Sequence, residues 1–148
     1  MASLTRASTR LVARLLLAAV VVAALASCRP MNEPEATLFA ATNDLRSDRG
    51  LPAYAQHAAL VDQAREWARW MASRGSLEHS DPDSWPVEWT AVAENVGASD
   101  TMDDIVDRLA ASPSHRANLL STKYTHMAIG TARGKDGRIY AAQLFWRG

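Results

Sequence analysis

The sequence predicts an α+β domain in which helices come first and a β-hairpin follows at the C-terminal end. Apolar residues recur at helical spacing through the segments 38–71 and 102–109. After residue 126 the period changes to two, and a glycine-containing turn divides that stretch. This order indicates at least one sheet covered by helices. The 121 residues that follow the first 27 have the length of a single domain.

Two helices are expected in the first half of the domain. The first contains Leu38, Ala41 and Leu45 at helical spacing and ends at Gly50-Leu51-Pro52. The second ends at Gly75, and its stripe is core material to which we assign no chemistry. That stripe consists of Leu60, Ala64, Trp67, Ala68 and Met71.

A loop is expected from Ser76 to Val92, because this stretch is polar and contains two prolines. Long loops in compact domains are either functional or disordered, and the tryptophans of this loop argue against disorder. We expect Trp85, Trp89 and the later Trp146 to pack over the core rather than to line a ligand site.

Two further helices and a hairpin complete the predicted domain. Thr101 begins a helix, with Asp104 three residues later as an approximate capping box. Ser112 is the expected N-cap of a short helix that ends near Leu120. The hairpin consists of an alternating strand around 127–131, a turn at 134–137 and a β-rich run at 139–146.

The N-terminal segment has the layout of a lipoprotein signal. Arg6, Arg10 and Arg14 precede an apolar run at 15–26, and small residues then lead to Cys28. A membrane-spanning helix needs about 20 apolar residues, so the run is short for one and suits a cleaved signal better. The ending resembles the lipobox of bacterial lipoproteins, which implies cleavage before Cys28 and a diacylglyceryl thioether on its sulfur.

That resemblance divides the chain into a signal peptide at 1–27, a lipidated tether at 28–35 and a domain at 36–148. It implies an exported protein that is anchored to a bacterial membrane through Cys28 and faces the extracytoplasmic side. An ordinary secretory signal with an incidental cysteine is the alternative.

Charge and cysteine content exclude several function classes. Without residues 1–27 the chain has a small excess of acidic residues, which does not favour binding to nucleic acid or a polybasic membrane-binding surface. Cys28 is the only cysteine of the chain. Once it carries lipid, a disulfide, a cysteine-type zinc site and a cysteine nucleophile are all excluded.

Three titratable residues beside loop or helix-start positions, outside the apolar stripes, are candidates for chemistry: His79, Glu94 and His115. His115 is expected at the third position of the short helix, where the helix dipole disfavours protonation and leaves a neutral imidazole as a competent ligand or base. Glu94 lies between apolar neighbours and needs a partner, which a histidine would supply. Spacing alone matches no compact zinc motif. On spacing alone, the alternative is a solvated His79, a His115 that satisfies a helix end and a structural Glu94.

The domain at 36–148 resembles the CAP family (SCP or PR-1-like), and specifically its short bacterial members. The similarity runs through nearly the whole domain in register, and the segment from Ser112 to Leu120 is the closest match. The resemblance implies a three-layer α-β-α sandwich with a central cleft. The other matching segments are Asn43, Arg46 and Gly50-Leu51, Leu77 to Ser80, Ala93 to Val96, Ile129-Gly130, and Tyr140 to Phe145.

In this family two histidines and two acids face the cleft and bind a divalent metal such as zinc in several members. His79, Glu94 and His115 match three of these groups, which makes the histidines the candidate metal ligands. Ser112 stands where many members have the second acid. Glu78 could substitute for it, but adjacent strand residues point to opposite faces. Arg116 and Asn118 are expected to line the cleft and brace it through hydrogen bonds.

Binding is the function that these observations favour. We expect a lipid-anchored, non-enzymatic domain that holds a small apolar, glycan or protein ligand at the cell envelope. The alternative is a metal-assisted hydrolase in which His79 and His115 bind the ion and Glu94 is the base. Catalytic zinc usually has three protein ligands, and using Glu94 as the third leaves no obvious base. A structural domain with a vestigial site is a third possibility.

Two histidines outside this group are expected to be structural. His57 precedes the second helix and is predicted to pack rather than to bind a ligand. His126 is predicted on the polar face of the first hairpin strand.

Overall fold

The computed structural model describes residues 29–148, of which 31–148 form one compact unit. The predicted signal peptide and Cys28 lie outside the described residues. No helix within 29–148 is both long enough and apolar enough to cross a membrane. The elements, in chain order, are α2 (Glu33–Ser47), β1 (Ala55–Gln56), α3 (Ala58–Arg74), the 3₁₀ helix η1 (Pro82–Ser84), β2 (Ala91–Ser99), α4 (Met102–Ala111), α5 (Pro113–Leu119), β3 (His126–Arg133) and β4 (Ile139–Arg147).

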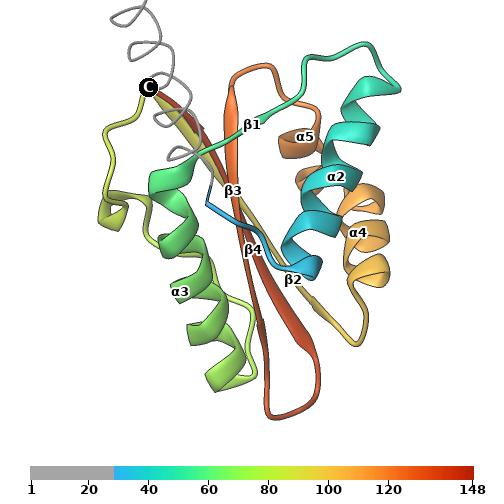
Figure 1. Cartoon of the computed structure of the whole chain (residues 1–148), viewed down its shortest axis with the longest axis vertical. Coiled ribbons are helices and arrows are strands. Elements are labelled where there is room, and N and C mark those ends of the chain that lie inside the picture. Colours follow the sequence, from blue (N-terminus) through green and yellow to red (C-terminus); the bar gives the residue numbers. More distant parts are fainter. Residues whose placement is uncertain (1–28) are drawn as a thin grey trace, which may run out of the picture. The chain divides into compact units, whose positions relative to one another are not determined.

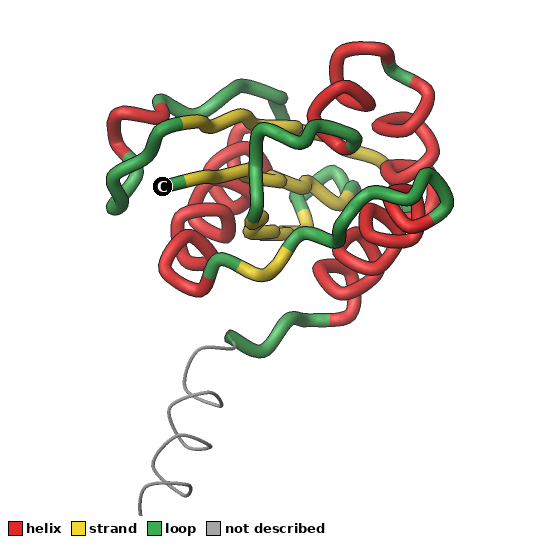
Figure 2. Tube along the Cα trace, turned by 90° about the horizontal axis from the view of Figure 1, so that it is seen from above, coloured by secondary structure: helices red, strands yellow, loops and turns green. Residues whose placement is uncertain are grey.

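The unit is a three-layer sandwich around a four-stranded sheet of order β1-β3-β4-β2. The β1–β3 pair is parallel and the other two pairs are antiparallel. Helix α3 covers one face of the sheet, and α2, α4 and α5 cover the other (Figure 1). Figure 2 shows the strands between these two helical layers. The predicted α-β-α sandwich is therefore confirmed.

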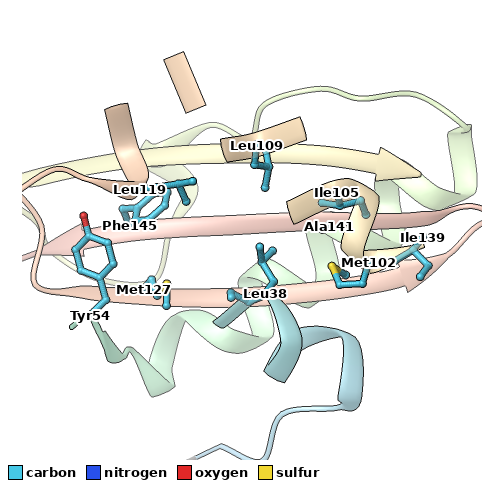
Figure 3. Close-up of a cluster of buried hydrophobic side chains, with 11 residues drawn as sticks. Leu38, Tyr54, Met102, Ile105, Leu109, Leu119, Met127, Ile139, Ala141 and Phe145 are labelled. Atoms are coloured by element: carbon cyan, nitrogen blue, oxygen red, sulfur yellow. The ribbon is translucent and has the colours of Figure 1, made fainter. Parts of the chain in front are cut away.

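Each face of the sheet has its own apolar core. On the face toward α2 and α4, Leu38, Ile105 and Phe145 belong to one buried cluster, and Figure 3 shows these helices directing their apolar side chains at the strands. On the α3 face, Leu60 and Leu144 belong to a second cluster. The apolar residues at helical spacing, from which the helices were predicted, thus supply much of both cores.

Helix α2 begins at Glu33 and thus includes the end of the segment that was predicted to be tether. Asn32 caps it: its side chain accepts a hydrogen bond from the Glu35 backbone N–H, and the Glu35 carboxylate accepts one from Asn32. Glu35 is fully buried and pairs with Arg65 of α3 at 2.6 and 2.8 Å. The early start follows from this cap and from a proline that fits the first turn.

Helix α3 lies unusually close to β3, and a glycine permits this approach. A Cβ on Gly130 would lie 2.1 Å from the backbone carbonyl carbon of Ala64. The helix ends at Gly75 with φ of 69°, as its sequence predicts. Any side chain at position 130 would therefore separate α3 from the sheet.

Strand β2 is absent from the sequence-based prediction. Its nine residues all pair with β4, whereas the sequence predicted a loop up to Val92 and no strand after it. Both faces of β2 are covered, so the polar-apolar alternation that marks a half-exposed strand is weak. Asn95 in its centre is also a residue type depleted in strands. The predicted C-terminal hairpin is confirmed as β3 and β4.

Candidate functional site

Glu94 of β2 binds the loop that carries His79. His79 Nδ1 lies 2.8 Å from Glu94 Oε1. The backbone N–H of Ser80 donates to the same oxygen at 2.9 Å, and Ser80 Oγ donates to Oε2 at 2.7 Å. The Glu94 side chain is 7% exposed and that of His79 is 62% exposed. The buried Glu94 carboxylate thus holds a histidine whose side chain is largely exposed to solvent.

Trp85 fixes the same loop from inside. Its Nε1–H donates to Ser80 Oγ at 3.0 Å, and its ring is buried in the α3-side core, as the sequence analysis expected. A cavity of about 300 Å³ lies at this junction. Its lining consists of His79, Ser80, Pro82, Trp85, Val92, Ala93 and Glu94.

The next residue of β2, Asn95, positions the second histidine from the opposite face of the sheet. Its Nδ2 donates to the backbone carbonyl of His115 at 3.2 Å and to Gln143 Oε1 at 3.2 Å. Its Oδ1 accepts from Asn118 Nδ2 at 2.9 Å. Gln143 then donates to Thr42 Oγ1 of α2 at 2.9 Å. This buried amide network holds α5, β2, β4 and α2 together.

His115 is the third residue of α5, as predicted. Its pKa is lowered mainly by burial and, second, by the charge of His79. The lowered pKa agrees with the neutral imidazole that the sequence predicts at this position. Ser112 does occupy the N-cap position, yet its hydroxyl lies 3.2 Å from Ser114 Oγ and caps no backbone N–H.

A second cavity, of about 350 Å³, lies beside His115 along the edge of β2. It is lined by Leu77, Val96, Gly97, Ala98, Ile105, Arg108, Leu109, Ser112, His115 and Arg138. The two histidines therefore line separate cavities that share strand β2.

Two residues, Arg116 and Asn118, were expected to brace the cleft, and side-chain hydrogen bonds within residues 29–148 are found for Asn118. Asn118 joins the amide network, and its Nδ2 also lies 3.5 Å from the Glu94 carbonyl. For Arg116, the hydrogen bonds found within 29–148 are those of the α5 backbone, so its bracing role stays a prediction. Ser80, Trp85 and Gln143 carry much of the geometry. Sequence reasoning assigned no site role to Ser80 or Gln143, and Trp85, which was predicted to pack over the core rather than to line a site, does both. Amide side chains inside otherwise apolar strands were the available signal.

The described residues do not fit a metal centre with three or more protein ligands. No three His, Asp or Glu side chains within 29–148 are arranged to hold one ion together. Both Glu94 oxygens accept hydrogen bonds from His79 and Ser80. The Glu78 carboxylate accepts a hydrogen bond from Ser76 Oγ at 3.1 Å within its own loop. Glu94 is thus a partner of the histidine rather than an available ligand.

The remaining histidines form a ring cluster away from these cavities. His57 packs against Trp146 with ring centroids 4.3 Å apart, and His126 lies 5.4 Å from the same ring. Burial and His126 lower the pKa of His57. The predicted packing of His57 and Trp146 is confirmed.

The comparisons with known proteins agree with this architecture. The model of the cysteine-rich secretory protein family, CAP, matches residues 39–146. The chain belongs to the CAP family. Among proteins with curated functions, none matches the sequence.

Solved CAP-fold structures superpose on most of the chain. An outer surface protein from Borrelia burgdorferi has a TM-score of 0.70 at 17% identity, over 80% of this chain and 96% of that one. A venom allergen-like protein from Schistosoma mansoni has a TM-score of 0.63 at 10% identity, over 80% and 90% of the two chains. A cysteine-rich secretory protein from Staphylococcus aureus has a TM-score of 0.61 at 23% identity, over 82% of this chain and 42% of that one. At these identities the likeness establishes the fold alone.

Proposed function

We propose that this CAP protein is a lipid-anchored, extracytoplasmic binding domain that holds its ligand in the cavities beside β2 and catalyses no reaction. The observation that carries the proposal is the state of Glu94. Three hydrogen bonds from His79 and Ser80 occupy its two oxygens. A carboxylate that holds a histidine and a loop through three charge-assisted hydrogen bonds acts as a positioning group.

The hydroxyl beside Glu94 is equally committed. Ser80 Oγ donates to Glu94 and accepts from Trp85 Nε1, so its proton and a lone pair are both in use. A nucleophilic serine needs a neighbouring base that takes its proton during attack. Within residues 29–148, the acceptor of the Ser80 hydroxyl proton is the carboxylate that already holds His79. This arrangement supports binding rather than acyl transfer.

The cavities have the character of small-ligand sites. Their volumes of about 300 and 350 Å³ lie at the lower end of the range for ligand pockets. The first combines apolar walls with His79 and Glu94, and the second combines them with His115 and two arginines. The first suits a mostly apolar ligand that carries a few polar groups, and the second also suits a ligand with acidic groups.

Mass spectrometry of molecules that co-purify with the domain tests the binding role. We expect a bound organic molecule in the wild type and less of it in a variant with both His79→Ala and His115→Ala. The metal content of the same samples addresses the hydrolase alternative. Stoichiometric zinc that disappears in the double variant would overturn the non-catalytic proposal and favour the metal-assisted hydrolase.

A Cys28→Ala substitution in the full chain tests the anchor. We expect the wild type to incorporate labelled palmitate and to sediment with membranes, and the variant to lose both properties. The thermal unfolding midpoint of the domain should be unchanged, because residues 31–148 form a unit of their own. A variant that still carries palmitate would contradict the lipid-anchor assignment.

A further inference from the structure

We propose that the groove along the free edge of β2 binds an extended, acidic polypeptide segment, which joins the sheet as an additional strand. This inference rests on the proposed binding function and names the class of ligand that the second cavity takes. It follows from the hydrogen-bonding groups, the walls and the charges of that groove.

Strand β2 ends the sheet and pairs on one side only, with β4. The carbonyl of Ala98 faces the other side, where it accepts from Arg138 Nη2 at 3.1 Å. The Glu94 carbonyl faces that side too, toward Asn118 Nδ2. Because backbone groups alternate along a strand, Val96 directs its N–H and C=O the same way. Within residues 29–148, no backbone hydrogen bond from another segment reaches Val96 there.

This edge is recessed rather than flat. Leu77 forms one wall, and Ile105 and Leu109 of α4 form the other. Val96 and Ala98 are each only 8% exposed, although they belong to a sheet edge. An exposed edge strand can pair with the edge of another sheet, and side chains that stand on both sides of the strand block such pairing. The groove thus admits a single extended chain but not the edge of a second sheet, which disfavours a second copy of this protein.

The charge of the groove specifies the partner. Its ten lining residues include two arginines and a histidine but no acid. Arg138 turns toward the edge through its bond to Ala98, and Arg108 lies on α4 with Asp104 as its partner at 2.8 Å. The Leu77 side chain, 46% exposed, supplies an open apolar surface. An extended segment that alternates acidic and apolar residues matches both features.

The distance along the edge sets the length of the bound segment. From Glu94 to Ala98 the strand advances four residues, or roughly 13 Å at the usual rise of a β-strand. Side chains of Asn118 and Arg138 occupy the carbonyls at the two ends. About four residues of the partner therefore lie against β2, and main-chain hydrogen bonds centre on Val96.

A fluorescein-labelled hexapeptide of alternating glutamate and valine, blocked at both ends, tests the inference with the full chain in detergent. We expect saturable binding by fluorescence anisotropy and at least tenfold weaker binding when lysine replaces glutamate. Two N-methylated peptides give the sharper test, one methylated on the glutamate amides and one on the valine amides. Each removes the N–H donors from one edge of the peptide only. Strand addition requires that one of them loses binding and the other retains it. Loss with both, or with neither, would overturn the proposal.

Protein variants locate the site. Leu77→Asp and Arg108→Gln should each weaken peptide binding at least fivefold. Trp89→Asp is the matched control, because Trp89 is the other large apolar side chain exposed within residues 29–148 and it does not line the groove. Unchanged thermal midpoints establish that the variants are folded. Equal weakening by Trp89→Asp, or none by Leu77→Asp, would contradict the assignment.

Two results would separate this inference from the proposed function. If the peptide fails to bind while mass spectrometry finds an organic ligand that depends on the two histidines, the strand-addition inference is wrong and the binding role stands. If the chain dimerises on concentration and the dimer excludes the peptide, a second copy occupies the groove and the peptide assignment is likewise wrong.

Discussion

Glu94 and Asn95 are neighbours in one strand, yet each organises a different histidine on a different face of the sheet. Glu94 holds a solvent-exposed His79 through its side chain, using charge. Asn95 is fully buried and holds His115 through the backbone carbonyl, using a neutral amide network. The two imidazoles are therefore positioned by independent means. His79 is a loop residue held by a buried carboxylate, whereas His115 is held because the amide network fixes its helix.

We expect the largest loss of stability from a substitution of the buried residue, Asn95. Asn95→Ala removes three buried hydrogen bonds and leaves Gln143 Oε1 without this donor, whereas Asn118 Nδ2 keeps its contact with the Glu94 carbonyl. Buried groups that lose a partner cost about 1–3 kcal/mol each before relaxation, so we expect a loss of about 3 kcal/mol in the free energy of unfolding. Urea unfolding followed by circular dichroism measures it. A loss below about 1 kcal/mol would show that the network is not what fixes α5.

Glu94→Gln should have a smaller effect, because one partner of Glu94 is exposed to water. The amide keeps the shape of the side chain but provides only one acceptor oxygen for three donors. We expect a loss of about 1–2 kcal/mol in the free energy of unfolding. NMR should show a His79 side chain with more motion and an unchanged α5. If α5 resonances shift as much as those of the His79 loop, the two histidines are not independently positioned.

A titration measures the remaining link between the two histidines. Burial and His79 both lower the pKa of His115, so replacing His79 with glutamine should raise that pKa toward its ordinary value without reaching it. NMR titration of the His115 ring protons is the measurement, and His126→Gln is the control that should leave them unchanged. An unshifted His115 in the His79→Gln variant would mean that the imidazoles do not sense each other.

The same lowered pKa values predict how stability depends on pH. His115 and His57 have folded-state pKa values below the value of 6.5 for an unperturbed histidine. The unfolded chain therefore binds protons more readily, and protonation favours unfolding. The contribution of the two neutral histidines to the free energy of unfolding should be fully present above pH 6.5 and should be lost as the pH falls through their folded-state pKa values. Replacing both residues with glutamine should flatten this dependence in urea unfolding between pH 7 and 5.

The sequence predicted those parts of the fold in which one side of an element meets the core. The stripes of α3 and α4 and the alternation of β3 are such patterns, and all three elements are present. Strand β2 carries no such signal, because α4 and α5 cover one of its faces and the Trp85 loop and side chains of α3 cover the other. Strand β1 has only two residues, too few for any period to appear. Its existence depends on pairing with β3, which is a property of the tertiary structure.

The site was predictable only in outline. The sequence alone made His79, Glu94 and His115 separate candidates, and the family resemblance grouped them, because residues that come from a loop, a strand and a helix have no fixed spacing. The register of β2 and β4 places Asn95 directly opposite Gln143, and no local pattern contains that pairing. The roles of Ser80 and Trp85 likewise follow from how the loop closes on β2. The sequence thus identifies the side chains of the site, whereas their partners come from the sheet and the loop that closes on it.

The buried ion pair between Glu35 and Arg65 limits how far the connection between Cys28 and helix α2 can extend. Unwinding the first turn of α2 would pull a carboxylate away from its guanidinium partner, so the connection to Cys28 cannot lengthen at the expense of the helix. Residues 28–32 span roughly 17 Å when fully stretched. Under the proposed lipid anchor at Cys28, the domain would be confined to a thin layer next to the bilayer, and a macromolecule that bound to it would have to enter that layer.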